Sequence, residues 1–393
     1  MREVKSNIWK IYLLQFLQGF WFILPIFILY FKIFNNLSYT QISTLEAAYS
    51  IFFFIFTIPC GAFSDLLNKN FSIFFGTIMV AVSMMIIGIG NSYFIFLAGN
   101  FIWAIGDGFL YSARGALMYD SIKQVGKEHE YLKISGRSNI FSVFPLILSG
   151  FLGPIMFLNN PRLPWLLMAG LWALSIIVVF FLVEPDKDNL ERSFKNYVNK
   201  IRDGLKFIIH EKHIIWITMF IIAMAIPISF FNEIVSQTYY LEIGFSVNNF
   251  SIIFPIIYGV ASLTASQSYR LVKLLGEQGS FVFIFTIHSI GLVLMGLLRT
   301  PFILIVIIIT YISRDFRWVY GDTYINKYAD SKIRATILSI ISMIISLFLS
   351  VFYILGGYLT DIFGIFRVLF MFGIFTAICS FILIFTKPSN NQI

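Results

Sequence analysis

The chain has 393 residues, of which 58% are hydrophobic and 12% are charged, and its mean hydropathy is +0.84. This composition excludes a soluble domain, because soluble proteins carry about 25% charged residues, and it indicates a polytopic membrane protein. We therefore assign the formal net charge of +8 to a protein surface that faces the membrane, and we do not interpret it as a sign of nucleic-acid binding.

Twelve apolar runs follow one another along the chain, each close to the roughly 20 residues that a spanning helix needs. A polar stretch at 184–212 separates the sixth run from the seventh, and its amphipathic part at 194–207 is expected to lie on the membrane surface as a short helix. The predicted domains are an N-terminal six-helix bundle at 1–183, a cytoplasmic linker at 184–212 and a C-terminal six-helix bundle at 213–393. The predicted spans are 8–31, 42–62, 71–90, 93–119, 136–158, 164–183, 213–241, 248–271, 279–298, 301–326, 334–358 and 365–386.

Lys and Arg residues are distributed unevenly over the predicted loops, and this bias sets the orientation of the chain. With a cytoplasmic N-terminus, 21 of the 28 basic residues lie inside the cell. Only Lys32, Arg162, Arg299 and Arg367 lie outside, and three more lie within spans. We therefore expect both termini in the cytoplasm, and we assign the positive charge to the cytoplasmic face, opposite anionic lipid.

Five short stretches resemble the major facilitator superfamily (MFS) of transporters. The loop Gly61–Lys69 follows Gly-x-x-x-Asp-x-x-x-Lys, which is similar to the family's loop between helices 2 and 3. Ser112–Ser121 is similar to a pattern of a bacterial and archaeal exporter-like branch, although Arg114 stands where that branch has an acidic residue. Gly150-x-x-Gly153-Pro154 is similar to the helix-5 pattern associated with antiporters. The other two stretches are Gly136-Arg137 and Arg334–Ser339.

The resemblance implies an all-α polytopic membrane protein with twelve transmembrane helices in two pseudo-symmetric six-helix bundles, working by alternating access. It also implies that Asp65 lies near Arg334 and that Lys69 reaches Asp120, two contacts that would hold the outward-open state. The alternative is that the positive charges of these loops only signal topology. The gating candidates are Gly61, Asp65, Lys69, Asp120, Arg137 and Arg334.

Charged and aromatic residues share one face of the fourth predicted span, where they recur at helical spacing. A charge at mid-bilayer costs about 2.5–3.5 kcal/mol, so it needs a partner or water. We predict that Asp107 takes up and releases a proton, while the arginines hold an anionic group or balance the carboxylates. The alternative is a permanent ion pair of Asp107 or Asp315 with an arginine. The stripe on the fourth span is Trp103, Asp107, Tyr111 and Arg114, and the matching stripe on the tenth is Tyr311, Arg314, Trp318 and Asp322, with Asp315 and Arg317 beside it.

Further polar residues lie within other predicted spans. Glu46 and Glu233 lie in outer halves of spans, where each is either a second proton site or an idle, solvated carboxylate. Gln15 and Gln18 suit hydrogen bonding to a neutral polar group, or equally a contact between helices, and His288 is expected to be a packing histidine. The proton-coupling candidates are Asp107, Glu233, Glu46 and Asp315, and the substrate-binding candidates are Gln15, Gln18, Trp103, Tyr111, Arg114, Gln237, Tyr311, Arg314, Arg317 and Trp318.

The cytoplasmic stretches contain no nucleotide-binding loop, metal-ligand spacing or nucleophile elbow, so no enzyme activity, cofactor or metal is expected. Cys60 and Cys379 are interpreted as small buried residues. The predicted function is a monomeric secondary transporter of a prokaryotic cytoplasmic membrane that couples protons to efflux of a small organic or amphipathic compound. Its partners would be that substrate, protons and the lipid bilayer. The alternatives are proton-coupled uptake of a small polar or anionic nutrient and, remotely, a membrane enzyme or sensor.

Overall fold

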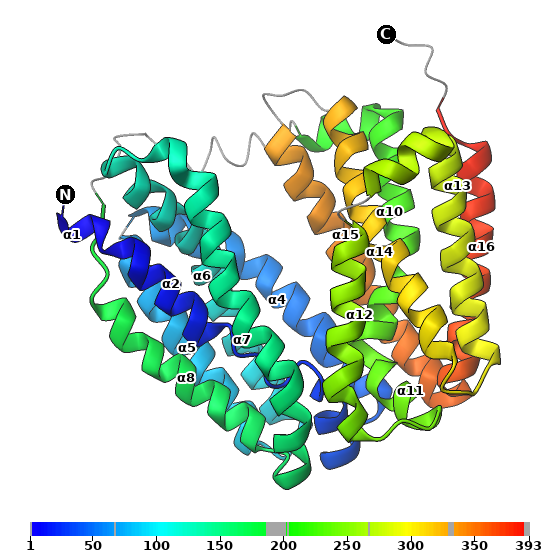
Figure 1. Cartoon of the computed structure of the whole chain (residues 1–393), viewed down its shortest axis with the longest axis horizontal. Coiled ribbons are helices and arrows are strands. Elements are labelled where there is room, and N and C mark those ends of the chain that lie inside the picture. The colour runs from blue at the N-terminus through cyan, green and yellow to red at the C-terminus, as the bar shows by residue number, and fades with distance from the viewer. Residues whose placement is uncertain are drawn as a thin grey trace. The chain divides into compact units, whose positions relative to one another are not determined.

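The computed structural model describes residues 2–66, 68–185, 202, 204–265, 268–328 and 334–388, and every regular element within these ranges is a helix (Figure 1). The chain falls into two compact units. The predicted domain boundaries stay a prediction, because units defined by packing need not coincide with bundles of successive spans. The expected surface helix at 194–207 lies mostly outside the described residues. Unit 1 contains Met1–Leu37, Ala48–Arg192 and Val247–Ile252, and unit 2 contains Ser38–Ala47, Ser193–Ser246 and Ile253–Ile393.

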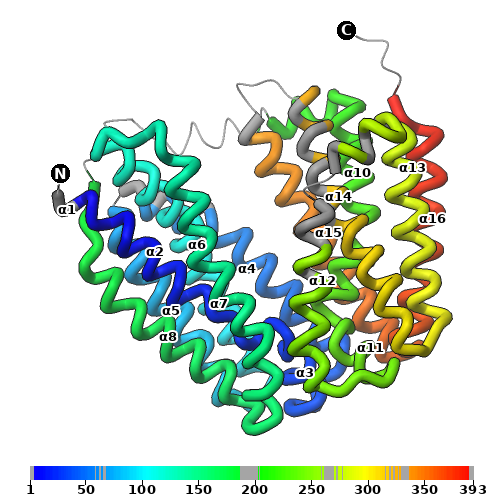
Figure 2. The backbone as a smooth tube through the Cα atoms, viewed as in Figure 1, coloured from blue at the N-terminus to red at the C-terminus, as the bar shows by residue number. Residues whose placement is uncertain are grey.

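Unit 1 is a bundle of long helices in which α5 packs against α6 and α8, and α2 packs against α7 and α8 (Figure 2). Its centre is aromatic: Phe96 and Trp165 are fully buried, and the hydroxyl of buried Tyr30 donates to the Ile87 carbonyl at 2.7 Å. The helices are α1 Arg2–Lys5, α2 Asn7–Gln18, α3 Phe27–Leu29, η1 Tyr30–Phe34, α4 Tyr39–Leu66, α5 Lys69–Ile89, α6 Tyr93–Gln124, η2 Glu128–Glu130, α7 Tyr131–Asn159 and α8 Leu163–Phe180, with residues 39–47 of α4 belonging to unit 2.

Unit 2 is a second helical bundle, in which α13 packs against α14 and α16, and α10 packs against α14, α15 and α16. Stacked and edge-on contacts among Trp216, Phe220, Phe281 and Phe285 fill its interior. The helices are α10 Lys212–Phe230, η3 Phe231–Val235, α11 Ser236–Glu242, η4 Val247–Asn249, α12 Phe250–Ala265, α13 Ser268–Leu297, α14 Ile303–Tyr328, α15 Arg334–Phe363 and α16 Ile365–Phe385, with residues 247–252 belonging to unit 1.

Within the described residues, eight helices are long and apolar enough to cross a membrane. Two shorter apolar helices, Val247–Ile257 and Ile303–Arg314, fall on the eighth and tenth predicted spans. The second predicted span corresponds to α4, a helix of 28 residues, and the first is interrupted. The eight long helices are Lys69–Ile89, Tyr93–Gln124, Glu128–Asn159, Leu163–Phe180, Lys212–Glu242, Gln278–Leu297, Thr336–Phe363 and Ile365–Phe385.

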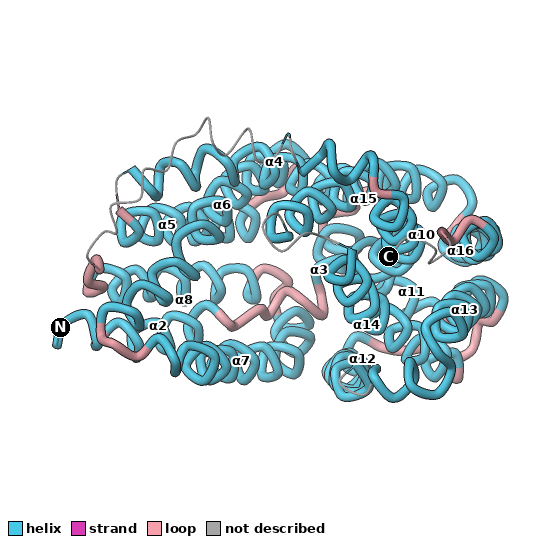
Figure 3. The backbone as a smooth tube through the Cα atoms, turned by 90° about the horizontal axis from the view of Figure 1, so that it is seen from above, coloured by secondary structure: helices cyan, strands magenta, loops and turns pink. Residues whose placement is uncertain are grey.

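The first predicted span, 8–31, is not one continuous helix. Helix α2 ends at Gln18, and a non-helical segment, Gly19–Ile26, separates it from α3 (Figure 3). Pro25 has no N–H to donate, and the segment lies directly against α7: a Cβ on Gly153 would lie only 2.2 Å from the Phe22 carbonyl oxygen. Short turns replace some of the missing helical hydrogen bonds of this segment. In one of them the Leu24 N–H donates to the Trp21 carbonyl at 3.0 Å, as a backbone within a membrane requires.

The seventh predicted span is disturbed at the corresponding place. Helix α10 contains Pro227 and passes at Phe231 into a π-helix, η3, before α11 continues from Ser236. The π-helix η1 of the first span begins at Tyr30, and η3 begins 201 residues later. Interrupted helices at matching places of two repeats mark substrate sites in transporters, and π-helical turns are frequent at functional sites.

Candidate functional site

The carboxylate of Asp107 lies half-buried in the middle of α6. The hydroxyl of Tyr49, from α4, donates to its Oδ2 at 2.5 Å. Among the described residues this carboxylate forms no ion pair, so its negative charge within a span is held by a neutral hydroxyl. Arg114 is near enough to interact electrostatically with Asp107 without forming an ion pair, so the predicted alternative of a permanent ion pair stays a prediction.

Aromatic rings surround this carboxylate. The ring of Trp103 lies one helical turn before Asp107, is 8% exposed, and contacts Tyr49 at a centroid distance of 5.2 Å. The interrupted segment of the first span places Trp21 against the same indole, with the ring centroids 5.8 Å apart. Tyr111 lies elsewhere, because it is 74% exposed and meets Phe53 edge-on. The predicted stripe of α6 is therefore split between a buried part and an exposed part.

Arg114, two turns after Asp107, is tied to other helices of unit 1. Its guanidinium donates to the side-chain oxygen of Gln18 on α2 and lies over the ring of Trp172 on α8, 5.4 Å from the centroid. The amide nitrogen of Gln18 in turn donates to the Ser175 hydroxyl at 2.8 Å. Gln15 is half-buried and makes no side-chain hydrogen bond with the described residues. The structure thus joins Gln18 and Arg114 in one chain of polar contacts.

In unit 2, a second polar chain forms at the π-helix η3. The hydroxyl of buried Tyr311 donates to Asn232 Oδ1 at 2.5 Å, and Asn232 Nδ2 donates to Glu233 Oε1 at 2.6 Å. The guanidinium of Arg314 lies 4.7 Å from the centroid of the Tyr311 ring. Two predicted substrate contacts and one predicted proton site therefore meet at one place, through Asn232.

The remaining predicted residues of unit 2 lie at different depths. Arg317 is 2% exposed, and its Nη1 donates to the Ile221 carbonyl at 3.4 Å, so it lies inside the bundle. His288 is fully buried and shares a hydrogen bond of 2.8 Å with Ser313. Gln237 is also buried. Glu46 is half-buried in the part of α4 that belongs to unit 2, where its charge interacts with that of Glu233.

Unit 1 contains all of the predicted gating residues except Arg334, which belongs to unit 2. Lys69 forms an ion pair with Asp120, which is the contact that the sequence predicts. The backbone N–H groups of Lys69 and Asn70 donate to the two carboxylate oxygens of Glu184, each at 2.9 Å. The gating role itself stays a prediction. A Cβ added to Gly61 would lie 3.7 Å from the Cβ of Ser112, which is ordinary contact, and Arg137 is exposed. The side chains of Asp65, Arg334, Asp315 and Trp318 lie outside the described residues.

Three residues that the sequence analysis did not single out complete these arrangements: Tyr49, Asn232 and Glu184. Tyr49 follows Glu46 by three residues, so it lies near the same face of α4. Asn232 precedes Glu233 within an otherwise apolar span. Each was a polar residue beside a predicted site, and that was the only signal available. In the part of the chain that the structure describes, no group of three or more His, Cys, Asp or Glu side chains could hold a metal ion.

Comparison with solved structures finds the same fold among transporters. A variant of the nucleoside transporter NupG superposes with a TM-score of 0.81 at 14% identity, covering 98% of this chain and 100% of that one. A bacterial homologue of the human lysosomal transporter Spinster, inward-facing and unoccupied, superposes with a TM-score of 0.78 at 14% identity, covering 98% of this chain and 96% of that one. A comparison with curated proteins gives no match.

The sequence profile of the Major Facilitator Superfamily matches residues 11–313. Together with the superpositions over 98% of the chain, this match confirms the predicted all-helical fold and the prediction that the chain is not an enzyme. This chain is a multi-pass membrane protein that belongs to the Major Facilitator Superfamily.

Proposed function

We propose that this protein is a proton-coupled transporter that exports a small organic or amphipathic compound by alternating access. The observation that carries the proposal is the Asp107 carboxylate, which lies within a span, accepts a hydrogen bond from Tyr49 and forms no ion pair with the described residues. An ionised carboxylate at mid-bilayer costs about 2.5–3.5 kcal/mol. Protonation removes that cost, so the group suits a cycle that loads and releases a proton.

The surroundings of Asp107 suit an organic cation as the exchanged substrate. Tyr49 and Trp103 lie beside the carboxylate and Trp21 stacks on Trp103, and aromatic faces attract cations by the ring quadrupole. A cation and a proton would then compete for the same negative charge. That competition couples entry of one to exit of the other, and the resemblance of Ser112–Ser121 and Gly150–Pro154 to exporter and antiporter patterns agrees with this direction.

The excess of basic residues on one side supports an orientation with both termini in the cytoplasm, in the cytoplasmic membrane of a prokaryote. The ion pair of Lys69 with Asp120 would then lie at the cytoplasmic end of unit 1, where breaking it would accompany opening to the inside. The family works as monomers by resemblance, and we propose the same here.

A second function, proton-coupled uptake of a small polar or anionic nutrient, is favoured by the Arg114 arrangement. A guanidinium, an amide from Gln18 and the ring of Trp172 lie together, which suits a planar or anionic polar solute. The similarity in fold to a transporter of nucleosides is compatible with that class. The two functions differ in direction, so cellular accumulation of a labelled substrate would fall in the first and rise in the second.

The experiment is proton release by the purified full-length protein in weakly buffered detergent, on addition of pooled organic cations, sugars or organic anions. We expect about one proton released per bound cation, no release from Asp107→Asn, and normal release from Glu128→Gln, which removes an exposed carboxylate outside the site. Release from Asp107→Asn equal to that of the wild type would overturn the role of Asp107. Binding of a sugar or an anion with proton uptake would favour the second function.

A further inference from the structure

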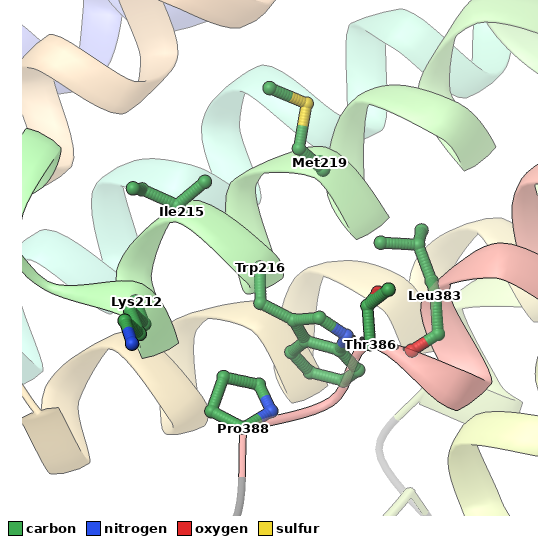
Figure 4. A pocket seen from close by; sticks show the side chains of 7 residues that line it. All are labelled: Lys212, Ile215, Trp216, Met219, Leu383, Thr386 and Pro388. Atoms are coloured by element: carbon green, nitrogen blue, oxygen red, sulfur yellow. Dashed lines mark hydrogen bonds between the residues drawn. The ribbon is translucent and has the colours of Figure 1, made fainter.

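A groove opens on the surface of unit 2 where α10 begins and α16 ends (Figure 4). Its volume is about 320 Å³, which is within the usual range of ligand pockets. The lining comes from residues 212–219 of α10 and from residues 383–388 at the end of α16 and just beyond it. None of the residues to which we assign substrate or proton binding lines it, so the groove needs a separate explanation.

The floor and wall of the groove are apolar. Trp216 is 4% exposed, and its indole Nε1 donates to the Leu383 carbonyl at 2.8 Å. The hydroxyl of Thr386 donates to the Ile382 carbonyl at 2.9 Å. The indole N–H of Trp216 and the hydroxyl of Thr386 thus bond to the protein's own carbonyls. Ile215 and Met219 present exposed apolar side chains. Such a lining favours a hydrocarbon chain over a polar solute, because a polar group placed there would lose hydrogen bonds to water.

One lysine lines the groove and a second lies beside it. Lys212, at the first position of α10, is exposed, and its ammonium group makes no hydrogen bond or ion pair with the described residues. Lys387 lies between the lining residues Thr386 and Pro388 but does not itself line the groove. Its ammonium group lies 5.4 Å from the centroid of the Trp216 ring and 5.9 Å from that of the Tyr324 ring. The nearby carboxylate of Glu211 is turned toward the backbone, where it accepts from the His213 N–H at 3.2 Å. Two positive charges and an indole therefore meet at the end of a span, where aromatic and basic residues favour the membrane interface.

An apolar groove with two lysines at the end of a span has the chemistry of an anionic phospholipid site. We propose that this groove binds an anionic phospholipid, which lies in the cytoplasmic leaflet in the orientation proposed above. Its acyl chain lies over Ile215 and Met219, and its headgroup phosphate lies between Lys212 and Lys387. The methylene stems of the two lysines extend along the apolar wall while their ammonium groups stay at the interface.

The test uses full-length protein in mixed micelles, with phosphatidylglycerol or phosphatidylcholine that carry the same brominated acyl chain. Bromine quenches indole fluorescence at short range, and the signal of Trp216 is isolated by subtracting that of Trp216→Phe, because the chain has seven tryptophans. We expect quenching at a lower mole fraction of phosphatidylglycerol than of phosphatidylcholine. Removing the lysines should weaken that preference about fivefold for each, or about 25-fold in the Lys212→Gln, Lys387→Gln double variant.

The matched control is the Lys133→Gln, Lys273→Gln double variant, which removes two exposed lysines elsewhere and should keep the wild-type preference. Equal quenching by the two lipids, no quenching by either, or an unchanged preference in the Lys212→Gln, Lys387→Gln variant would each overturn the proposal. If Trp216→Phe does not fold, mass spectrometry of lipid retained by the purified protein gives the same decision. The wild type should retain phosphatidylglycerol over phosphatidylcholine, and the Lys212→Gln, Lys387→Gln variant should lose that excess.

Discussion

Arg114, in the predicted stripe of α6, and Arg317, beside the predicted stripe of α14, differ in what holds them. Arg114 donates to the side chain of Gln18 and lies over Trp172, so its partners can rotate and a ligand can replace them. Arg317 is 2% exposed and donates to the backbone carbonyl of Ile221, which cannot move without moving α10. Two arginines at similar places in the sequence of the two spans therefore differ, because Arg114 belongs to an adaptable site and Arg317 to the interior of the bundle.

The interruptions of the first and seventh spans differ in the same sense. The first span loses helical structure over Gly19–Ile26, which brings Trp21 to Trp103. The seventh only widens into a π-helix at Phe231–Val235, which turns Asn232 toward Tyr311. Unit 1 therefore departs further from a regular helix, and it does so beside its candidate proton site. Four pairs of variants test whether this difference between the units matters for transport.

The largest effect is expected from the arginines. Arg317→Gln removes the buried guanidinium that donates to the Ile221 carbonyl, and a buried polar group left without its partner costs about 3 kcal/mol, so the apparent melting temperature should fall by about 8 °C. Arg114→Gln should leave the melting temperature within about 2 °C and lower transport more than tenfold. Thermal unfolding in detergent and transport in proteoliposomes measure the two quantities. If both variants changed both quantities equally, the contrast between support and site would be wrong.

A smaller effect is expected from two glycines that lie at crowded places. A Cβ on Gly153 would lie 2.2 Å from the Phe22 carbonyl oxygen, whereas on Gly356 it would lie 2.6 Å from the Phe230 ring. Overpacking costs about 1–3 kcal/mol, and a backbone atom yields less readily than a ring. Gly153→Ala should therefore destabilise the protein and disturb the site more than Gly356→Ala. Equal melting temperatures for the two variants would show that the Gly19–Ile26 segment can shift freely.

The two tyrosine hydroxyls of the sites should also differ. Tyr49 donates to a carboxylate and Tyr311 to a neutral amide. Hydrogen bonds to charged groups contribute about 1.5–3 kcal/mol, against about 0.5–1.5 kcal/mol for neutral pairs. Tyr49→Phe should lower proton-driven transport about tenfold, and Tyr311→Phe by less than about threefold. The reverse order would move the principal proton site to Glu233 and unit 2.

The smallest effect is expected from two carboxylates that cap helices. Asp361 accepts from the N–H groups of Tyr39 and Thr40 at 2.9 and 2.8 Å and from the Thr40 hydroxyl at 2.6 Å. Glu184 accepts only the N–H groups of Lys69 and Asn70. A lost cap costs about 1 kcal/mol, so Asp361→Asn should lower the melting temperature by about 3 °C and Glu184→Gln by less. A larger fall for Glu184→Gln would contradict this order.

Much of the architecture could be predicted from the order of residues along the chain. Apolar runs of spanning length, the polar stretch at 184–212 and the loop Gly61–Lys69 were enough to predict the helical class and the family. These features are local, because a bilayer requires each span to be apolar and to satisfy its own backbone. The ion pair of Lys69 with Asp120 could also be predicted, because both residues belong to stretches that resemble the family.

The partners of each charge could not be predicted in this way. Spans are apolar on all sides, so hydrophobic periodicity does not indicate which face of a span meets another helix. It therefore could not predict that Tyr49 of α4 contacts Asp107 or that Arg317 is buried.

The sequence by itself determined that the chain spans a membrane many times and that carboxylates and arginines lie within the predicted spans, and it predicted that the basic residues gather on one side. Only the tertiary structure decided that the first span is interrupted, because the break depends on the close approach of a second backbone at Gly153. It also decided that Asp107 is held by a hydroxyl while Arg114 turns to Gln18. Those choices depend on which helices become neighbours, and a single span carries no information about its neighbours.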